Sequence, residues 1–257
     1  MATYKKRGHK PKTKVEKEVE AIDDSTTAEV FASLDEGASK TEQWVEKNQK
    51  AIFGVLMAAV IVVLGVLAYN KFIAEPNEIE AAEELTQAQE DFNTALTTTN
   101  TTIKDSLYGI ALSGSNGKYG LLEIVDKYGG TKAGNLAKYY AGMSYLETKN
   151  YGEAINYLQD FKASDAMLAP LAKGAIGDAF SQLNQNGDAM EYYEKAISLS
   201  TNDFTTPRFL FKAAVTAIDL GEDDKAVKLL TRIKDEFSTS DYAKQVDLYL
   251  GKAQAAN

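Results

Sequence analysis

An uninterrupted run of twenty uncharged residues, AIFGVLMAAVIVVLGVLAYN, lies between Lys50 and Lys71 and constrains the fold more than any other feature. A helix needs about 20 apolar residues to cross a hydrocarbon core about 30 Å thick. A buried helix of a soluble protein would normally show a polar face, and this run has none. A cleavable signal peptide begins near residue 1, whereas this run starts after fifty residues. The sequence therefore predicts one retained transmembrane helix, residues 45–71, with Trp44 and Tyr69 near the two interfaces.

The distribution of Lys and Arg predicts the orientation of this helix. Residues 1–50 contain ten Lys/Arg, seven of them within the first seventeen positions, whereas acidic residues dominate after Lys71. The positive-inside rule places the N-terminus in the cytoplasm and the C-terminal part across the membrane. We expect residues 1–44 to form a flexible cytoplasmic tail. Its basic cluster is most simply a topology determinant, although contact with anionic lipid or RNA stays open.

Small side chains lie on one side of the predicted span. Gly54, Ala58 and Gly65 fall within about 40° on a helix of 3.6 residues per turn. Such a face allows close approach of another helix, so we predict a helix contact there. The alternative is that Gly and Ala are simply common in membrane helices, and the GxxxG pattern itself is absent.

Composition limits the possible chemistry. The chain has no cysteine, and its one histidine is His9, so the folded part lacks thiol, His-metal and Ser-His-Asp chemistry. Residues 72–257 carry seventeen Lys/Arg and twenty-seven Asp/Glu, a net charge of −10 that disfavours nucleic acid. We predict no catalytic, cofactor or metal site. An enzyme that uses the carboxylate pairs Asp223/Asp224 or Glu191/Glu194 is the alternative.

Three segments of residues 133–257 repeat one pattern. They are GMSYLETKNYGEAINYLQDF from Gly142, GDAFSQLNQNGDAMEYYEKA from Gly177 and AVTAIDLGEDDKAVKLLTRI from Ala214. Each places an alanine twelve positions after its first residue, and these alanines lie 35 and 37 residues apart. That period is close to the 34-residue helix–turn–helix unit of the tetratricopeptide repeat. We therefore predict an all-α chain, a single transmembrane helix followed by a tetratricopeptide-repeat solenoid.

The repeat pattern also predicts local packing. The small first residue and the alanine let two helices approach closely, with turns at Lys149-Asn150, Asn184–Asn186 and Gly221. Upstream, residues 72–132 are expected to form an N-terminal cap or degenerate repeat, with two short helical pieces broken at residues 113–117. Its first helix, 78–96, has four candidate buried positions, which are Ile79, Leu85, Phe92 and Leu96.

The stretch GGTKAGNLAKYYAGMSYL, residues 129–146, resembles a phosphate-binding loop at first sight. Gly129 and Gly134 have the glycine spacing of G-x-x-x-x-G-K-[ST], but Asn135 and Leu136 replace the Lys and the Ser/Thr. The alternative is a turn that leads into the first repeat, with Thr131 as the helix cap. We favour the turn.

First helices line the concave groove in such arrays, which predicts the partner site. Counting from the small residue of each repeat gives Leu136, Tyr139, Met143, Leu146, Leu171, Asp178, Ser181, Gln182, Arg208, Phe211, Val215 and Asp219. This mixture suits an unfolded segment or an amphipathic peptide. The alternative is that many of these side chains pack against neighbouring helices or the protein's own C-terminus. A carboxylate clamp is disfavoured, although Arg208 and Lys212 could imitate part of one.

The basic tail, single span and acidic repeat domain resemble the YfgM-type ancillary subunits of the SecYEG translocon. The stretches YGGTKAGNLAKYYAGMSYL, LAPLAKGAIGDAF and EYYEKAISLS are similar to the version found in Bacteroidetes-type bacteria. The resemblance implies a bacterial inner-membrane protein with a periplasmic domain. It further implies SecYEG, a periplasmic chaperone or a client polypeptide as partners. The alternative is an envelope-coordinating tetratricopeptide protein of the cell-division or Tol-Pal type.

Overall fold

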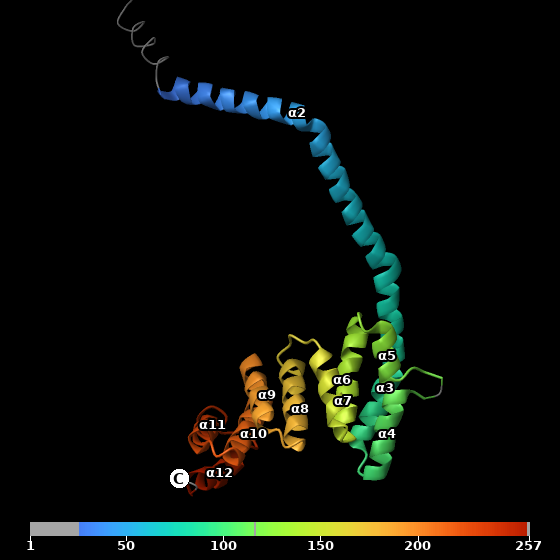
Figure 1. Cartoon of the computed structure of the whole chain (residues 1–257), viewed down its shortest axis with the longest axis vertical. Helices are drawn as coiled ribbons and strands as arrows, with labels where there is room; N and C mark the ends of the chain where they lie inside the picture. Colours follow the sequence, from blue (N-terminus) through green and yellow to red (C-terminus); the bar gives the residue numbers. More distant parts are fainter. Residues whose placement is uncertain (1–25, 116, 256–257) are drawn as a thin grey trace, which may run out of the picture. The chain divides into compact units, whose positions relative to one another are not determined.

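A computed structural model describes residues 26–115 and 117–255. Every regular element among these residues is helical, and none of them is a strand (Figure 1). The chain divides into two compact units, residues 1–69 and 70–257. The described part therefore has the all-α class that the sequence predicts. The basic cluster of residues 5–17 lies outside the described residues.

Helix α2, Thr26–Tyr69, is the described part of the first unit. It is long and apolar enough to cross a membrane. Residues 26–44 are helical, whereas the sequence analysis expected a flexible tail up to residue 44. The helix extends this far because no proline interrupts residues 12–75, and Lys40 pairs with Glu36 one turn away at 2.9 Å.

The second unit begins with a π-helical turn, Asn70–Ala74, which leads directly into α3, Glu75–Thr97. Helical backbone thus continues past residue 71, where the predicted span ends. The buried face of α3 repeats every three or four residues and consists of Ala81, Leu85, Ala88, Phe92 and Ala95. Ile79 and Leu96 are exposed, so their predicted burial is wrong. Ile79 lies on the opposite side of the helix, and Leu96 lies in its last turn.

Two short helices follow, α4, Thr101–Ser113, and α5, Leu121–Tyr128. The break between them falls at the predicted place, and Gly114 turns the chain there with φ 88°. These helices pack with α3 and with α6, Lys132–Glu147, around one core. Tyr108, Leu121 and Ile124 are fully buried in it.

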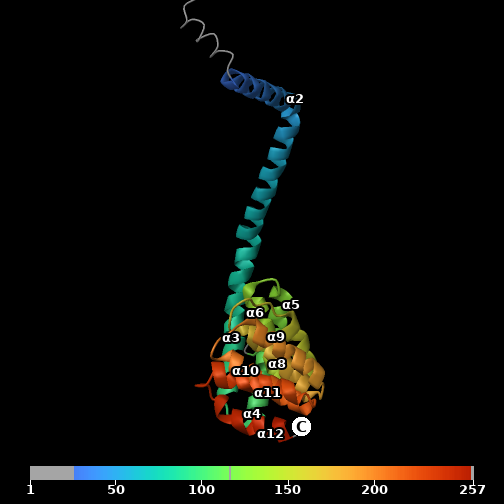
Figure 2. The same cartoon turned by 90° about the vertical axis from the view of Figure 1, so that its left-hand side faces the viewer.

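Three helix pairs make up the repeats, and they succeed one another along the solenoid (Figures 1 and 2). The pairs are α6 with α7, Tyr151–Asp160; α8, Leu168–Gln182, with α9, Asn186–Leu199; and α10, Thr205–Asp219, with α11, Asp223–Glu236. A final helix, α12, Ala243–Ala255, packs on α11 and α10.

The repeat positions pack as the sequence predicts. The three register alanines, Ala154, Ala189 and Ala226, are fully buried. A Cβ atom on Gly142 would lie 2.5 Å from Leu158, and one on Gly177 would lie 2.6 Å from Tyr193. Both glycines are therefore needed for close contact between the two helices of a repeat.

The turns within the repeats also lie where expected. Asn184 and Gly221 adopt positive φ values of 58° and 74°. In the first repeat the residue with positive φ is Lys149, at 64°, and not the neighbouring Asn150 that would tolerate it better.

The stretch that resembles a phosphate-binding loop forms the capped start of α6. The Thr131 hydroxyl accepts a hydrogen bond from the Gly134 amide at 2.9 Å, as expected for a cap. The Glu78 carboxylate of α3 accepts from the amides of Lys132 and Ala133 at 2.8 and 3.2 Å. A carboxylate of the chain itself therefore occupies the amides that an anion would need.

Candidate peptide-binding groove

An open groove with a volume of ≈ 610 Å³ lies along the first helices of the repeats. Its walls come from the C-terminal halves of α6, α8 and α10, because equivalent positions recur in each repeat. The segment that contains α12 contributes two lining tyrosines. The lining side chains are Leu146, Glu147, Lys149, Tyr151, Asp178, Ser181, Gln182, Tyr193, Phe211, Lys212, Val215, Thr216, Asp219, Tyr242 and Tyr249.

The structure brings many of the predicted partner residues together here. Those that line the groove are Leu146, Asp178, Ser181, Gln182, Phe211, Val215 and Asp219. Because they come from three successive repeats, they form one continuous surface. Their contact with a partner stays a prediction.

The other predicted residues lie elsewhere. Leu136 and Leu171 pack against core clusters, and Met143 lies between two of them. Tyr139 packs on Phe161, with ring centroids 5.3 Å apart, and burial raises the pKa of its hydroxyl. These residues are partly buried because each packs against a core cluster formed with neighbouring helices.

Arg208 lines an adjacent cavity formed with the loop before α12, and not the groove itself.

Sequence reasoning missed the aromatic contribution of the C-terminal segment. Phe211 of α10 packs against Tyr242 and Tyr249, with ring centroids 5.6 and 4.9 Å apart. Tyr242 immediately precedes α12, and Tyr249 lies within it, seven residues later. This spacing of about two helical turns is the signal that could have identified them. Tyr151, at the start of α7, donates a hydrogen bond to Gln182 at 3.3 Å across the groove.

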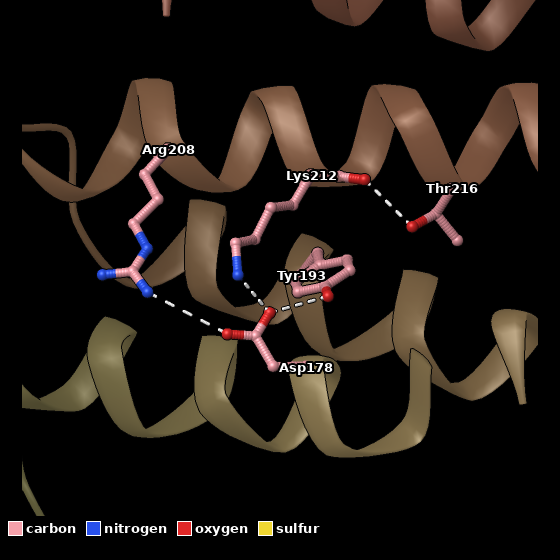
Figure 3. Close-up of polar contacts among 5 residues, drawn as sticks. All are labelled: Asp178, Tyr193, Arg208, Lys212 and Thr216. Carbon is pink, nitrogen blue, oxygen red and sulfur yellow. Dashed lines mark hydrogen bonds and ion pairs between the residues drawn. The ribbon is translucent and has the colours of Figure 1, made fainter. Parts of the chain in front are cut away.

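A polar network centred on Asp178 lies in the wall of the groove (Figure 3). Lys212 of α10 donates a hydrogen bond to Oδ1 of Asp178, and the Tyr193 hydroxyl of α9 donates to the same oxygen at 2.8 Å. Nη2 of Arg208 lies 3.9 Å from Oδ2. Burial, followed by the Asp178 charge, raises the pKa of Tyr193 far above its ordinary value.

This network determines what the groove offers to a ligand. Lys212 and Arg208, the two residues that could imitate a carboxylate clamp, both face a carboxylate of the chain itself. An incoming carboxylate would have to displace Asp178 to use them. Outside this network the groove presents aromatic rings, hydroxyls and the Gln182 amide, together with the charged side chains of Glu147, Lys149 and Asp219.

The carboxylate pairs considered for catalysis lie outside this groove. Glu194 pairs with Lys225 at 2.7 Å, and Glu191 pairs with Lys195 within one turn of α9. Asp223 and Asp224 stand in the first turn of α11, where its dipole favours acidic side chains. Within residues 26–115 and 117–255, no three His, Cys, Asp or Glu side chains gather closely enough to hold a metal ion.

Comparisons with known proteins agree with the helix pairs. Family models of the tetratricopeptide repeat match residues 136–165, 172–203 and 209–240. No curated protein sequence matches the chain. Among solved structures, the crystal structure of MamA protein is similar, with 17% sequence identity and a TM-score of 0.43. The match covers 68% of this chain and 92% of that chain.

Each family match coincides with one of the three helix pairs. The folded unit is thus a tetratricopeptide-repeat solenoid, which is a scaffold for protein–protein interaction. The same chain carries a helix that is long and apolar enough to be a membrane span.

Proposed function

We propose that this protein is a membrane-anchored, periplasmic interaction scaffold that binds protein segments in the groove of its repeats. The observation that carries the proposal is the groove itself, which is shared by the first helices of three successive repeats. Anchoring keeps such a groove close to a membrane-embedded partner, so its effective concentration is high. Weak affinity for each segment would then suffice.

The chemistry of the groove indicates the kind of segment it accepts. Tyr151, Phe211 and Tyr249 offer aromatic surface for apolar side chains, and the hydroxyls with Gln182 offer hydrogen bonds to an extended backbone. Because Asp178 neutralises Lys212, recognition does not depend on a terminal carboxylate. An unfolded client or an amphipathic segment of a chaperone fits these requirements.

The specific role we propose is that of an accessory subunit of the Sec translocon, linking it to periplasmic chaperones or emerging clients. The resemblance to YfgM-type subunits supports this role. The excess of Lys/Arg before the span supports a cytoplasmic N-terminus in a bacterial inner membrane. Gly54, Ala58 and Gly65 would provide the contact face toward a channel helix.

Photocrosslinking in intact cells tests the proposal. A benzophenone amino acid replaces Gln182, which is exposed in the groove, and, as the matched control, Asn156, which is exposed on the second helix of the first repeat. We expect adducts with Sec channel subunits, a periplasmic chaperone or a translocating client from position 182 only. Adducts with division or Tol-Pal proteins would favour the envelope-coordinating alternative. Absence of adducts, or equal adducts from both positions, would contradict a binding groove.

A further inference from the structure

The portion of α2 that precedes the uncharged run 51–70 of the predicted span, Thr26–Lys50, carries an apolar face of its own. Val30, Phe31 and Leu34 are 54%, 67% and 62% exposed, and Trp44 and Val45 are 60% and 44% exposed. Solvent-exposed residues of this size in one short stretch mark a surface that contacts something else.

These side chains lie on one side of the helix. With 100° per residue, Val30, Phe31, Leu34, Trp44 and Val45 fall within an arc of about 140°. Gly37, Ala38 and Thr41 fill the same arc, whereas every charged residue from Asp35 to Lys50 lies outside it. The segment is therefore an amphipathic helix with a broad apolar face.

We infer that this amphipathic helix lies in the membrane interface, with its apolar face in the lipid and its charged face in water. The inference rests on the membrane span of the proposed function. Continuity with the span supports lipid as the occupant, because only Glu46–Lys50 separate Val45 from Ala51, the first residue of the uncharged run. Phe31 and Trp44 on the apolar face suit the depth of the headgroups.

A second copy of the chain fits this face less well. A two-stranded coiled coil buries a narrow seam of a and d positions, whereas this arc is wide enough for an interfacial helix. In the heptad register that places Phe31 and Val45 at a positions, Thr41 would occupy a d position, which weakens the seam.

The sequence before the span also provides a place where the helix can turn from the surface into the bilayer. Five polar residues in succession, Glu46–Lys50, separate the amphipathic face from the uncharged run. Within them, the Asn48 side chain donates a hydrogen bond to the Trp44 carbonyl at 2.7 Å. Such a bond competes with the backbone ladder and favours bending. Without a turn, Phe31 would stand about 30 Å from Ala51 along the helix axis.

The charges of residues 26–50 predict which force binds this helix to the membrane. Residues 26–50 contain five acidic residues and three lysines, so this helix is not attracted electrostatically to anionic lipid. Its binding is driven by the apolar face and should persist at high salt.

Tryptophan quenching in the full-length protein tests this inference, since Trp44 is the only tryptophan. In a Trp44→Phe background, Phe31→Trp reports on the apolar face far from the span, and Gln43→Trp is the control on the polar face. Each variant is reconstituted in zwitterionic phosphatidylcholine vesicles that contain brominated lipid. We expect several-fold stronger quenching of Phe31→Trp than of Gln43→Trp, unchanged at about 1 M salt, where the Debye length is about 3 Å.

Two outcomes would overturn the interfacial helix. One is equal, weak lipid quenching at both positions with strong quenching by aqueous acrylamide. The other is a Phe31→Trp signal that is shielded from acrylamide but insensitive to brominated lipid and dependent on protein concentration, which would indicate a second copy. A third reporter, Val60→Trp, lies in the middle of the span, and quenching there by deeply brominated lipid tests the span itself. Absence of lipid quenching at position 60 would reject the membrane anchor. Absence of lipid quenching at position 31 alone would reject only the interfacial helix.

Discussion

The Tyr193 hydroxyl donates a hydrogen bond to Asp178 at 2.8 Å and thereby joins the two helices of the second repeat. The same carboxylate accepts from Lys212 of the third repeat, so one acidic side chain connects two neighbouring repeats in the wall of the groove (Figure 3). Asp178 therefore contributes both to the stability of the solenoid and to the chemistry of its candidate binding surface.

Replacement of this carboxylate should destabilise the fold. Asp178→Asn removes the negative charge opposite Lys212, whose side chain is only 30% exposed. We expect a loss of about 1.5–3 kcal/mol in the free energy of unfolding, the range for hydrogen bonds to charged groups. Urea denaturation of the detergent-solubilised protein measures it. Asp160→Asn, at an exposed position at the end of α7, is the control and should change stability by less than about 0.5 kcal/mol. Equal effects of the two variants would contradict the role assigned to the network.

The close contact at Gly177 should be intolerant of a methyl group. In Gly177→Ala the new Cβ would lie 2.6 Å from the Tyr193 ring, which must then shift away from Asp178. We expect destabilisation by about 1–3 kcal/mol, as for other overpacked sites. Gly187→Ala is the matched control, because a Cβ there meets nothing within 4 Å and alanine favours helix, so the Tm should stay constant or rise. A tolerated Gly177→Ala would show that the two helices can separate at little cost.

Buried Tyr108 should make the stability pH-dependent in alkali. Its hydroxyl has no hydrogen-bond partner among the described residues, and burial, followed by the charge of Glu147, raises its pKa to about 12 from the ordinary 10.0. The folded state therefore retains this proton more strongly than the unfolded state. Its contribution to stability is complete below pH 10 and is lost as the pH rises toward 12.

Tyr108→Phe removes this titration and a buried hydroxyl without a partner. We expect the variant to gain about 1 kcal/mol at neutral pH and to lose less stability than the parent between pH 10 and 12. Thermal melts of the parent and of Tyr108→Phe across this range provide the comparison. A parental slope in Tyr108→Phe would contradict the assignment.

The repeat architecture was predictable because it depends on local spacing. Ala154, Ala189 and Ala226 recur at nearly constant intervals, and this periodicity fixed both the helix pairs and their contact faces. About half of the residues that line the groove were predictable from the same periodicity. Tyr139 and Met143 share the register of groove positions, but their surroundings depend on how neighbouring helices and loops cover them. The repeat register alone does not predict which positions neighbouring helices and loops bury.

The interactions that could not be predicted join residues distant in sequence. Glu78 caps a helix that starts 54 residues later, and Asp178 meets Lys212 from 34 residues away. Neither pair leaves a local pattern, because any of the many carboxylates in this acidic domain could have supplied the partner. Only the three-dimensional arrangement selects them.

The Glu78 cap should be measurable as a stability contribution. Glu78→Ala leaves the Lys132 and Ala133 amides without their acceptor and removes a negative charge from the N-terminus of α6. We expect a loss of about 0.5–2 kcal/mol, the range for helix caps. Urea titration of the parent, Glu78→Ala and the control Glu83→Ala, whose side chain is exposed on α3, gives the comparison. Added phosphate should stabilise Glu78→Ala more than the parent. Equal stabilisation of the two proteins by phosphate would contradict occupancy of these amides by Glu78.

The proposed topology can be tested directly because the chain contains no cysteine. Single cysteines at Ser39, before the span, and at Thr99, in the exposed loop between α3 and α4, place one reporter on each side. In intact cells with a permeabilised outer membrane, a membrane-impermeant maleimide should label Thr99→Cys at once. Ser39→Cys should react only after the inner membrane is disrupted, because the ten Lys/Arg of residues 1–50 favour a cytoplasmic N-terminus in the proposed topology. Labelling of Ser39→Cys in intact cells with protection of Thr99→Cys would reverse the orientation. Immediate labelling of both would argue against a membrane-spanning helix.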